Sequence, residues 1–597
     1  MSHYRSNLRD IEFNLFEVLR IQDYLGTGDW ADLDIDTARD VLEEIERLAR
    51  EDFAASYVDQ DRIPLELKDG VVELPASVKA GVRAYKDGGW DRFGAPADLG
   101  GTPVPPSLLW ATQEMLLASN TVVAWYAGGS LFARVLFEEG TDDQKALASL
   151  WMDRQWSGSM ILTEPDAGSD VGASTTKAVD MGDGTWHLEG VKRFITGGEH
   201  DAAENIIHLV LARREGAVAG TKGLSLFVVP KYLVNPDGSL GDRNGVVATN
   251  LEKKMGLKGS TTCEMTFGAD RPAIGMLVGN VHDGIRQMFR VIEGARMMIG
   301  TKAMGTLSTG YLNALKYAKE RRQGADLARA TDKTAPRVPI IDHPDVRRTL
   351  MTLKAYSEGL RALVMYTAWV QDQSALHPDD DRWERRSDFL LPLVKGYSSE
   401  TAYHQLAEAL QVFGGSGFTQ DYPLEQYIRD TKIDTIYEGT TGIQALDLFF
   451  RKIARDQGVT LAALASEITE FVKGGLGDDP LAEERESLAR MLDDAQTQLG
   501  SMVEDLMASY SGDSAEIYKV GLHTNSLLQS LAEVIIAWQM LRHADIAIGR
   551  VDEDPFYVGK VESARWFLRM AAPQVAARRE AAVAEDGSLM KMPVAAL

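Results

Sequence analysis

Residues Ile206–Ala212 read IIHLVLA, and residues Leu224–Val229 read LSLFVV. Both runs are short, apolar and rich in β-branched residues, and turn sequences such as Gly182-Asp183-Gly184 and Pro236-Asp237-Gly238 separate the runs of this region. Short apolar runs between glycine-rich turns are typical of strands joined in hairpins. With the alternating run Glu264–Phe267, they predict a β domain over residues 158–283.

The sequence on both sides of this block has helical spacing. On the N-terminal side, after an extension over residues 1–35, a helical domain is expected over 36–157, with Asp36 or Thr37 as a helix cap and residues 88–105 as a loop. On the C-terminal side, a helical domain is expected over 284–455. It should contain helices over Gly294–Arg321 and Pro344–Ser374, separated by a polar loop over Gly324–Pro339.

Residues 456–597 form a fourth block, with four amphipathic segments divided by glycine and proline breakers. The predicted helices lie around residues 461–472 and 488–506, and over Ala515–Ile548 and Val558–Val583. Together they predict a small antiparallel bundle, an extra helical domain over 456–597.

Composition excludes several classes of protein. The formal charge is 63 − 88 = −25, which argues against general nucleic-acid binding. The single cysteine, Cys263, excludes an intrachain disulfide framework and a cysteine-rich metal site, and is expected in a core strand. The apolar run Val534–Leu541 is too short to span a bilayer, and residues 1–7 show no secretory signal, so a cytoplasmic location is expected.

Four separated segments carry the chemistry. They are Met160–Lys177 (MILTEPDAGSDVGASTTK), Lys192–Gly198 (KRFITGG), Gln411–Asp430 (QVFGGSGFTQDYPLEQYIRD) and Ile433–Gln444 (IDTIYEGTTGIQ). Their order and spacing closely resemble the acyl-CoA dehydrogenase family over roughly residues 30–455. The C-terminal extension and the Arg321-Arg322-Gln323-Gly324 variant resemble the subgroup that contains 3-methylmercaptopropionyl-CoA dehydrogenases and large actinobacterial fatty acyl-CoA dehydrogenases.

The resemblance implies an α+β multidomain fold. It consists of an N-terminal α-helical domain, a middle β-barrel-like domain, a C-terminal four-helix bundle domain and the additional C-terminal helical bundle. It also implies FAD as the cofactor, and no metal is expected. The sequence has no strand-adjacent GxGxxG for a nicotinamide cofactor, which agrees with a flavin as the acceptor.

Glu438 is the expected catalytic base. The α-hydrogen of a thioester is weakly acidic, and a carboxylate in a water-poor pocket is a stronger base than in water. In the family, the glutamate of the YEGT motif does this work. Some relatives carry the base at the position of Ala295, which cannot act. Glu293 is a weaker rival as base and is expected to help hold the CoA portion.

The resemblance also assigns the cofactor and substrate contacts. Along the flavin ring it places Leu162, Thr163, Phe194 and Thr196, with phenylalanine at 194 where tryptophan is usual. Near the phosphates and the adenosine end, partly from a neighbouring subunit, it places Gly168, Ser169, Arg321, Gln411, Gly414, Gly415, Thr440 and Gly442. For the acyl-CoA substrate it places Ser169, Glu293, Arg296 and Gly439.

The expected reaction is α,β-dehydrogenation of a fatty acyl-CoA to a trans-2-enoyl-CoA, with electrons passed to an electron-transfer flavoprotein. Two alternatives stay open: an acyl-CoA oxidase that uses O₂, and a non-dehydrogenating family member that binds nucleic acid or acts as a scaffold. The acidic extension favours a homodimer over contact with a membrane surface, although such contact is the other explanation for the extra bundle.

Overall fold

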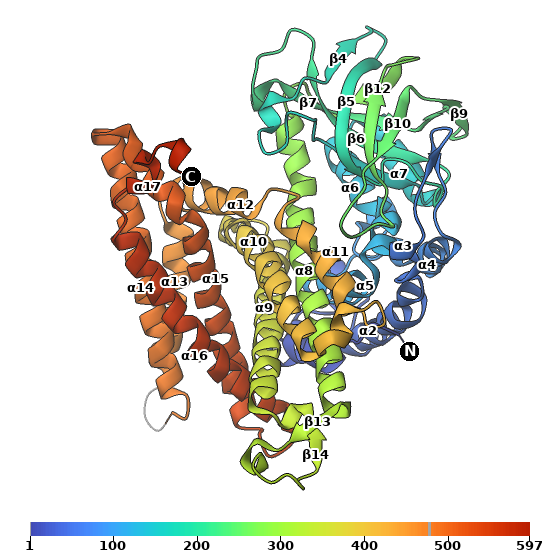
Figure 1. Cartoon of the computed structure of the whole chain (residues 1–597). Coiled ribbons are helices and arrows are strands. Elements are labelled where there is room, and N and C mark those ends of the chain that lie inside the picture. Colours follow the sequence, from blue (N-terminus) through green and yellow to red (C-terminus); the bar gives the residue numbers. More distant parts are fainter. Residues whose placement is uncertain (1, 476–478) are drawn as a thin grey trace. The chain divides into compact units, whose positions relative to one another are not determined.

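The computed structural model describes residues 2–475 and 479–597 (Figure 1). These residues form two compact units: residues 2–5 with Tyr24–Ala295 make the first, and Ser6–Asp23 with Arg296–Leu597 make the second. Helix α8 (Gly284–Glu320) carries the chain from the first unit into the second.

Helices precede the sheet of the first unit, as expected. They are α2 (Ile35–Leu48), α3 (Asp59–Arg62), α4 (Ala76–Asp87), α5 (Pro106–Ala127), α6 (Gly129–Glu139) and α7 (Asp142–Asp153). The predicted cap of α2 was wrong, because the Asp34 carboxylate accepts the Thr37 N–H at 2.7 Å and starts the helix earlier. A short hairpin, β1 (Leu67–Lys68) with β2 (Val71–Val72), was not expected, since two-residue strands show no alternation.

The middle of the first unit is a closed sheet with extensions, which confirms the predicted barrel-like domain. Strand β4 pairs with both β5 and β6, so β5, β12, β7, β6 and β4 form a ring. Strand β3 adds to β6, and β11 and β10 add to β5. The strands are β3 (Ser157–Ile161), β4 (Lys177–Asp180), β5 (Trp186–Thr196), β6 (Ile206–Arg214), β7 (Leu224–Pro230), β10 (Val246–Leu251), β11 (Thr262–Phe267) and β12 (Ala273–Leu277), with a separate hairpin of β8 (Tyr232–Val234) and β9 (Leu240–Arg243).

The continuous apolar run of β6 is explained by burial of both faces of the strand. Ile207 and Leu209 enter one hydrophobic cluster, and Val210 and Ala212 enter another on the opposite face. A strand covered on both faces has no solvent side, so its sequence does not alternate. Cys263 of β11 lies in the second cluster, as expected for a core residue.

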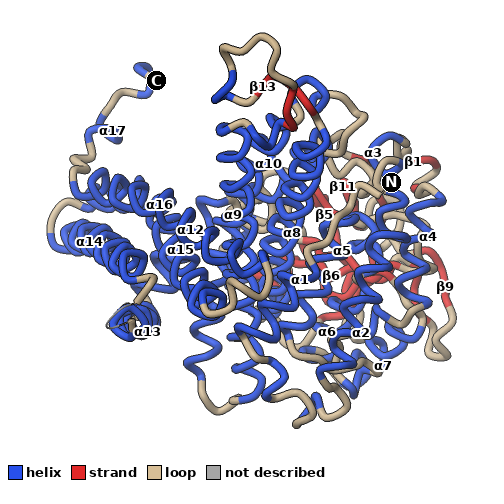
Figure 2. Tube along the Cα trace, turned by 90° about the horizontal axis from the view of Figure 1, so that it is seen from below, coloured by secondary structure: helices blue, strands red, loops and turns tan. Residues whose placement is uncertain are grey.

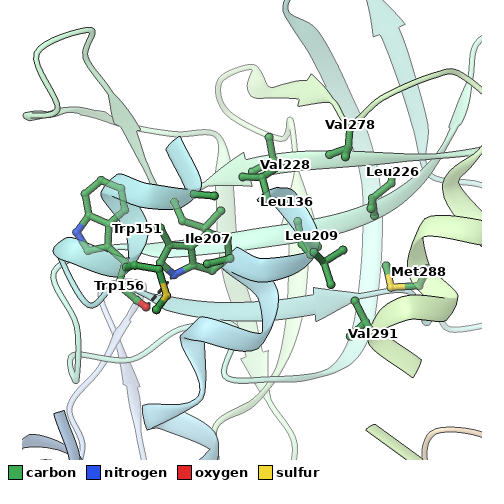
Figure 3. Close-up of a cluster of buried hydrophobic side chains, with 14 of the residues drawn as sticks. Leu136, Trp151, Trp156, Ile207, Leu209, Leu226, Val228, Val278, Met288 and Val291 are labelled. Carbon is green, nitrogen blue, oxygen red and sulfur yellow. Dashed lines mark hydrogen bonds between the residues drawn. The ribbon is translucent and has the colours of Figure 1, made fainter. Parts of the chain in front are cut away.

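The first cluster contains side chains from the sheet, from the helices that precede the sheet in the sequence and from α8, which follows it (Figure 3). Trp151 of α7 donates its indole N–H to the carbonyl of Trp156 at 2.8 Å. Met288 and Val291, from the first turns of α8, pack on the same cluster. The start of α8 is thereby fixed to the β domain.

The second unit is mostly helical, with the short strand β13 (Arg322–Ala325) drawn in red in Figure 2. Besides α1 (Leu8–Glu12), its α-helices are the rest of α8, α9 (Pro344–Leu376), α10 (Asp381–Val412), α11 (Leu424–Thr431), α12 (Thr441–Asp447), α13 (Val459–Gly474), α14 (Ala482–Ser511), α15 (Ile517–Ile548), α16 (Pro555–Val583) and α17 (Ser588–Lys591). The four predicted segments of the last block are confirmed as α13–α16. Of the described helices, none is long and apolar enough to cross a membrane.

The segment between α8 and α9 differs from the expected loop. Strands β13 (Arg322–Ala325) and β14 (Arg337–Pro339) form an antiparallel hairpin. His343, just before α9, makes a 2.6 Å hydrogen bond with the Gln323 carbonyl. The hairpin has only two paired positions, which leaves too little pattern for sequence prediction.

The N-terminal helix α1 (Leu8–Glu12) belongs to the second unit and is held there by buried charge. The Asp10 carboxylate accepts hydrogen bonds from Arg361 of α9 at 2.5 Å and from Lys560 of α16 at 2.6 Å. Lys560 also pairs with Glu358 at 3.2 Å, and all these side chains are buried. Asp10 therefore connects three helices that are far apart in the sequence.

We expect Asp10→Asn to destabilise the protein by about 3–5 kcal/mol, because the two buried cations lose their shared counter-charge. Burial raises the pKa of Asp10, but Lys560 and Arg361 outweigh that effect and hold it well below its usual range. This contribution is present above the ordinary aspartate pKa and is lost as the pH falls through the lowered one. Thermal unfolding at several pH values measures it.

The exposed pair Arg20–Asp23 supplies the matched control. Asp23→Asn should leave the unfolding temperature nearly unchanged, since exposed ion pairs contribute little. Equal unfolding temperatures for the Asp10 and Asp23 variants would contradict the role given to Asp10.

Candidate functional site

The first unit presents its predicted site residues where β3 ends. The loop after β3 is anchored by Glu164, whose carboxylate accepts the N–H groups of Thr175 at 2.7 Å and Thr176 at 2.9 Å. Lys192 of β5 pairs with Glu164 at 3.0 Å and donates to the Leu162 carbonyl at 2.8 Å. Leu162 and Thr163 are therefore held by a buried ion pair that the sequence did not reveal.

The charges of this pair survive burial. Burial raises the pKa of Glu164, but the Lys192 charge and the two amides outweigh it and lower the pKa to about 2. Burial lowers the pKa of Lys192 to about 8, against the pull of Glu164. Both groups are thus ionised at neutral pH, and the loop keeps its anchor there.

Phe194 is an exposed aromatic residue on a strained backbone. Its φ is +63°, in the left-handed region, and its side chain is 55% exposed. The Arg193 guanidinium lies 4.8 Å from the ring centre, and the Arg193 N–H donates to the Thr163 carbonyl at 2.9 Å. Positive φ at a bulky residue is costly and marks functional sites. Phe194 thus offers a flat apolar face beside Thr163.

Two more predicted positions of this unit lie in the loop after β3. Gly168 and Ser169 are exposed, and a Cβ built on Gly168 would meet no atom within 4 Å. Thr196 ends β5, two residues after Phe194, and is partly exposed. The structure therefore collects the predicted flavin residues of this unit around the ends of β3 and β5.

The two positions on α8 that were weighed as sites of a base differ in exposure. Glu293 is partly buried on α8, and Ala295 is buried.

In the second unit, Glu438 sits between α11 and α12 on an unusual backbone. Its φ is +54°, and that of Gly439 is +87°. Only glycine adopts this region readily, so the conformation of Glu438 is strained. A Cβ on Gly439 would also come within 2.8 Å of the Gln444 amide nitrogen. These two residues form a tight turn that fixes the backbone of Glu438.

The electrostatic surroundings of Glu438 make it a stronger base than a solvated glutamate. Burial raises its pKa above the usual range, while Lys395 and Arg296 partly offset that rise. Arg296 is itself buried and pairs with Asp447 at 2.7 Å, and its Nε has no hydrogen-bond partner among the described residues. Sequence reasoning named Arg296 but missed Asp447.

Further buried groups support the turn. Lys395 donates to the Gly439 carbonyl at 2.6 Å, and Gln444 donates to the Glu438 carbonyl at 3.0 Å. Upstream, the Tyr437 hydroxyl donates to Asp434 at 2.7 Å, and Lys302 pairs with that carboxylate at 2.7 Å. The sequence did not assign a supporting role to these residues. Lys302 and Lys395 lie inside regular helices, and the others lie in the segment Ile433–Gln444, which was singled out for Glu438.

The predicted nucleotide contacts of this unit lie at the end of α8 and at a glycine turn after α10. Tyr317 of α8 stacks on Phe413 with 4.4 Å between ring centres. This contact brings the end of α8, where Arg321 is exposed, to the exposed Gly414 and Gly415. A Cβ on either glycine would meet no atom within 4 Å, so the backbone is open.

The remaining predicted positions are placed by helix ends. Gln411 is exposed in the last turn of α10. The Thr440 hydroxyl caps α12 by accepting the Ile443 N–H at 3.3 Å, and Gly442 is partly exposed in its first turn. Glu438, Gly439, Thr440 and Gly442 therefore belong to one short segment.

The residues present suit FAD. Phe194 provides an apolar face for a flat ring, and Arg321 provides an exposed guanidinium for a phosphate. The open backbone at Gly168, Gly414 and Gly415 leaves room for close approach of a ligand.

Comparison with known proteins agrees with these observations. Models of the acyl-CoA dehydrogenase middle domain and C-terminal domain match residues 159–269 and 282–451, and a model described as acetyl-CoA dehydrogenase C-terminal like matches 464–593. A broad-specificity linear acyl-CoA dehydrogenase of Mycobacterium tuberculosis is 53% identical over the full length of both chains. A 3-methylmercaptopropionyl-CoA dehydrogenase of Ruegeria pomeroyi is 34% identical, over 98% of this chain and 99% of that one.

Solved structures share the fold. An acyl-CoA dehydrogenase of Bacillus anthracis complexed with FAD aligns with a TM-score of 0.72 at 20% identity, over 94% of this chain and 90% of that chain. Caenorhabditis elegans ACDH-11 in complex with C11-CoA aligns with a TM-score of 0.70 at 20% identity, over 95% and 91%. On the full-length identity above all, this chain belongs to the acyl-CoA dehydrogenase family.

Proposed function

We propose that the protein is an FAD-dependent dehydrogenase that converts linear fatty acyl-CoA thioesters to trans-2-enoyl-CoA, with Glu438 as the catalytic base. The observation that carries this proposal is the raised pKa of Glu438 on a strained turn. The relative from Mycobacterium tuberculosis, identical at 53% of aligned positions, is described as acting on linear acyl-CoA.

The chemistry divides between the chain and its cofactor. The Glu438 carboxylate takes the α-proton, and the β-hydrogen leaves with its electron pair. FAD, when bound, supplies the acceptor for that hydride. The Glu438 N–H would help to stabilise the charge that develops on the thioester oxygen, an effect that works best from a group already held in place.

The same residues as in the sequence analysis would hold the cofactor. Leu162, Thr163, Phe194 and Thr196 would lie against the ring, and Gly168, Ser169, Arg321, Gln411, Gly414, Gly415, Thr440 and Gly442 would lie along the nucleotide. Ser169, Glu293, Arg296 and Gly439 would contact the CoA thioester. Burial of Arg296 with Asp447 supports a fixed position for it close to the base.

The finer features of the proposal concern partners and location. Electrons would pass to an electron-transfer flavoprotein rather than to O₂, the protein would be a cytoplasmic homodimer, and it would not bind nucleic acid. The net charge of −25 supports the last point. Hydrogen peroxide yield under air, light scattering and a DNA mobility-shift assay test these three features.

We expect Glu438→Gln to abolish bleaching of the flavin by acyl-CoA, with a loss of about a thousandfold or more, because the amide cannot accept the α-proton. Bound FAD should be retained, since the turn and its glycine stay. Anaerobic single-turnover absorbance measures both quantities.

Glu425→Gln is the control, because Glu425 pairs with Arg429 one helical turn away and is not among the proposed site residues. That variant should bleach at the wild-type rate. Normal bleaching in the Glu438 variant would reject the proposed base.

The rate of flavin bleaching should rise with pH. Only the ionised form of Glu438 accepts a proton, and burial raises its pKa. Activity is therefore lost as the pH falls through this raised pKa, above the range of an ordinary glutamate. Bleaching rates across a pH series check this, and a midpoint at the ordinary glutamate pKa would contradict it.

A further inference from the structure

Lys395 is a charged residue in the interior of the second unit. It lies on α10, its side chain is fully buried, and burial lowers its pKa to about 8. A buried ammonium is costly unless hydrogen bonds and counter-charges compensate for it. The partners of Lys395 therefore indicate its purpose.

The Lys395 ammonium donates to the Gly439 carbonyl at 2.6 Å. The Gln444 amide donates to the Glu438 carbonyl at 3.0 Å and to the Gly439 carbonyl at 3.3 Å. Two successive carbonyls are thus fixed at the point where the backbone is strained at Glu438. A conformation of this kind persists only when its surroundings determine it, and these donors supply that constraint.

The charges near Lys395 come from four elements. They are Asp434 of the turn after α11, Glu438 itself, Glu400 of α10 and Arg296 of α8. Asp434 is already paired with Lys302 and with the Tyr437 hydroxyl, and Glu400 accepts the Thr441 hydroxyl at 2.7 Å with His404 4.0 Å away.

The Glu438 carboxylate is different from these neighbours. In the described part of the chain, it accepts no hydrogen bond from a side chain, and Lys395 and Arg296 act on it only through their charge. Arg296 has its own counter-ion in Asp447. Lys395, by contrast, forms no ion pair with another carboxylate among the described residues. Its charge is therefore available to the Glu438 carboxylate.

We propose that Lys395 is a positioning residue for the base: its bond to the Gly439 carbonyl fixes the strained turn, and its charge favours the ionised form of the Glu438 carboxylate. This role rests on the proposed function of Glu438. In this role Lys395 assists proton removal by acting through Glu438 and its turn.

Proton exchange at the α-carbon of acetyl-CoA in D₂O tests the role. Acetyl-CoA has α-hydrogens but no β-hydrogen, so exchange reports the base without dehydrogenation. Lys395→Met should lower the exchange rate at neutral pH by about tenfold or more and move the midpoint of its pH profile upward by roughly one unit, because the carboxylate loses a neighbouring cation. Lys395→Arg keeps the charge and should keep the midpoint close to that of the wild type.

Lys452→Met is the matched control. Lys452 is also largely buried and contacts α10 through Asp388, but it has no bond to the turn. Its exchange profile should match the wild type. Lys395→Gln, which keeps a donor but no charge, gives the same upward shift if the methionine variant does not fold.

An unshifted midpoint in both uncharged Lys395 variants would overturn the role of Lys395 while leaving Glu438 as the base. Failure of the proposed function itself gives a different result. If Glu438 is not the base, Glu438→Gln retains acetyl-CoA exchange and flavin bleaching at the wild-type level.

Discussion

The site depends on one electrostatic balance at Glu438. A carboxylate becomes a stronger base when water is removed from it, but the same loss of water favours its neutral form, which cannot take a proton. Here burial raises the pKa, and the cations Lys395 and Arg296 limit the rise. A buried cation itself needs a counter-charge or hydrogen-bond acceptors, and Asp447 meets this need for Arg296.

The rest of the second unit can be understood as a rigid support for that balance. Glu438, the proposed base, lies on a short connection between α11 and α12, which by itself would adopt many conformations. Donors from α10 and α12 fix its carbonyls, and Lys302 of α8 fixes the turn before it. Three helices, α8, α10 and α12, thus determine the conformation of a few residues.

The sequence predicted the large features of the fold, and its motifs named candidate site residues, but it did not reveal the buried groups that support them. The strands around IIHLVLA and the four helices of the last block follow from periodicity over many residues, and the structure has them. Lys192, Lys395 and Asp447 could not be found in this way. A single buried charge inside a regular helix or strand has no local signature, and its partner lies far away in the sequence. The β13–β14 hairpin was missed because it is too short to show a pattern.

The position of Asp10 has a consequence for biosynthesis. Its partner Lys560 is 550 residues further along the chain. At a translation rate of about 5–20 residues per second, the ribosome adds Lys560 roughly half a minute to two minutes after Asp10. During this interval the nascent N-terminal segment, which includes Phe13, Leu15 and Phe16, has not yet been covered by the helices that bury it in the finished protein. Folding of the second unit can therefore be completed only after Lys560 has been synthesised.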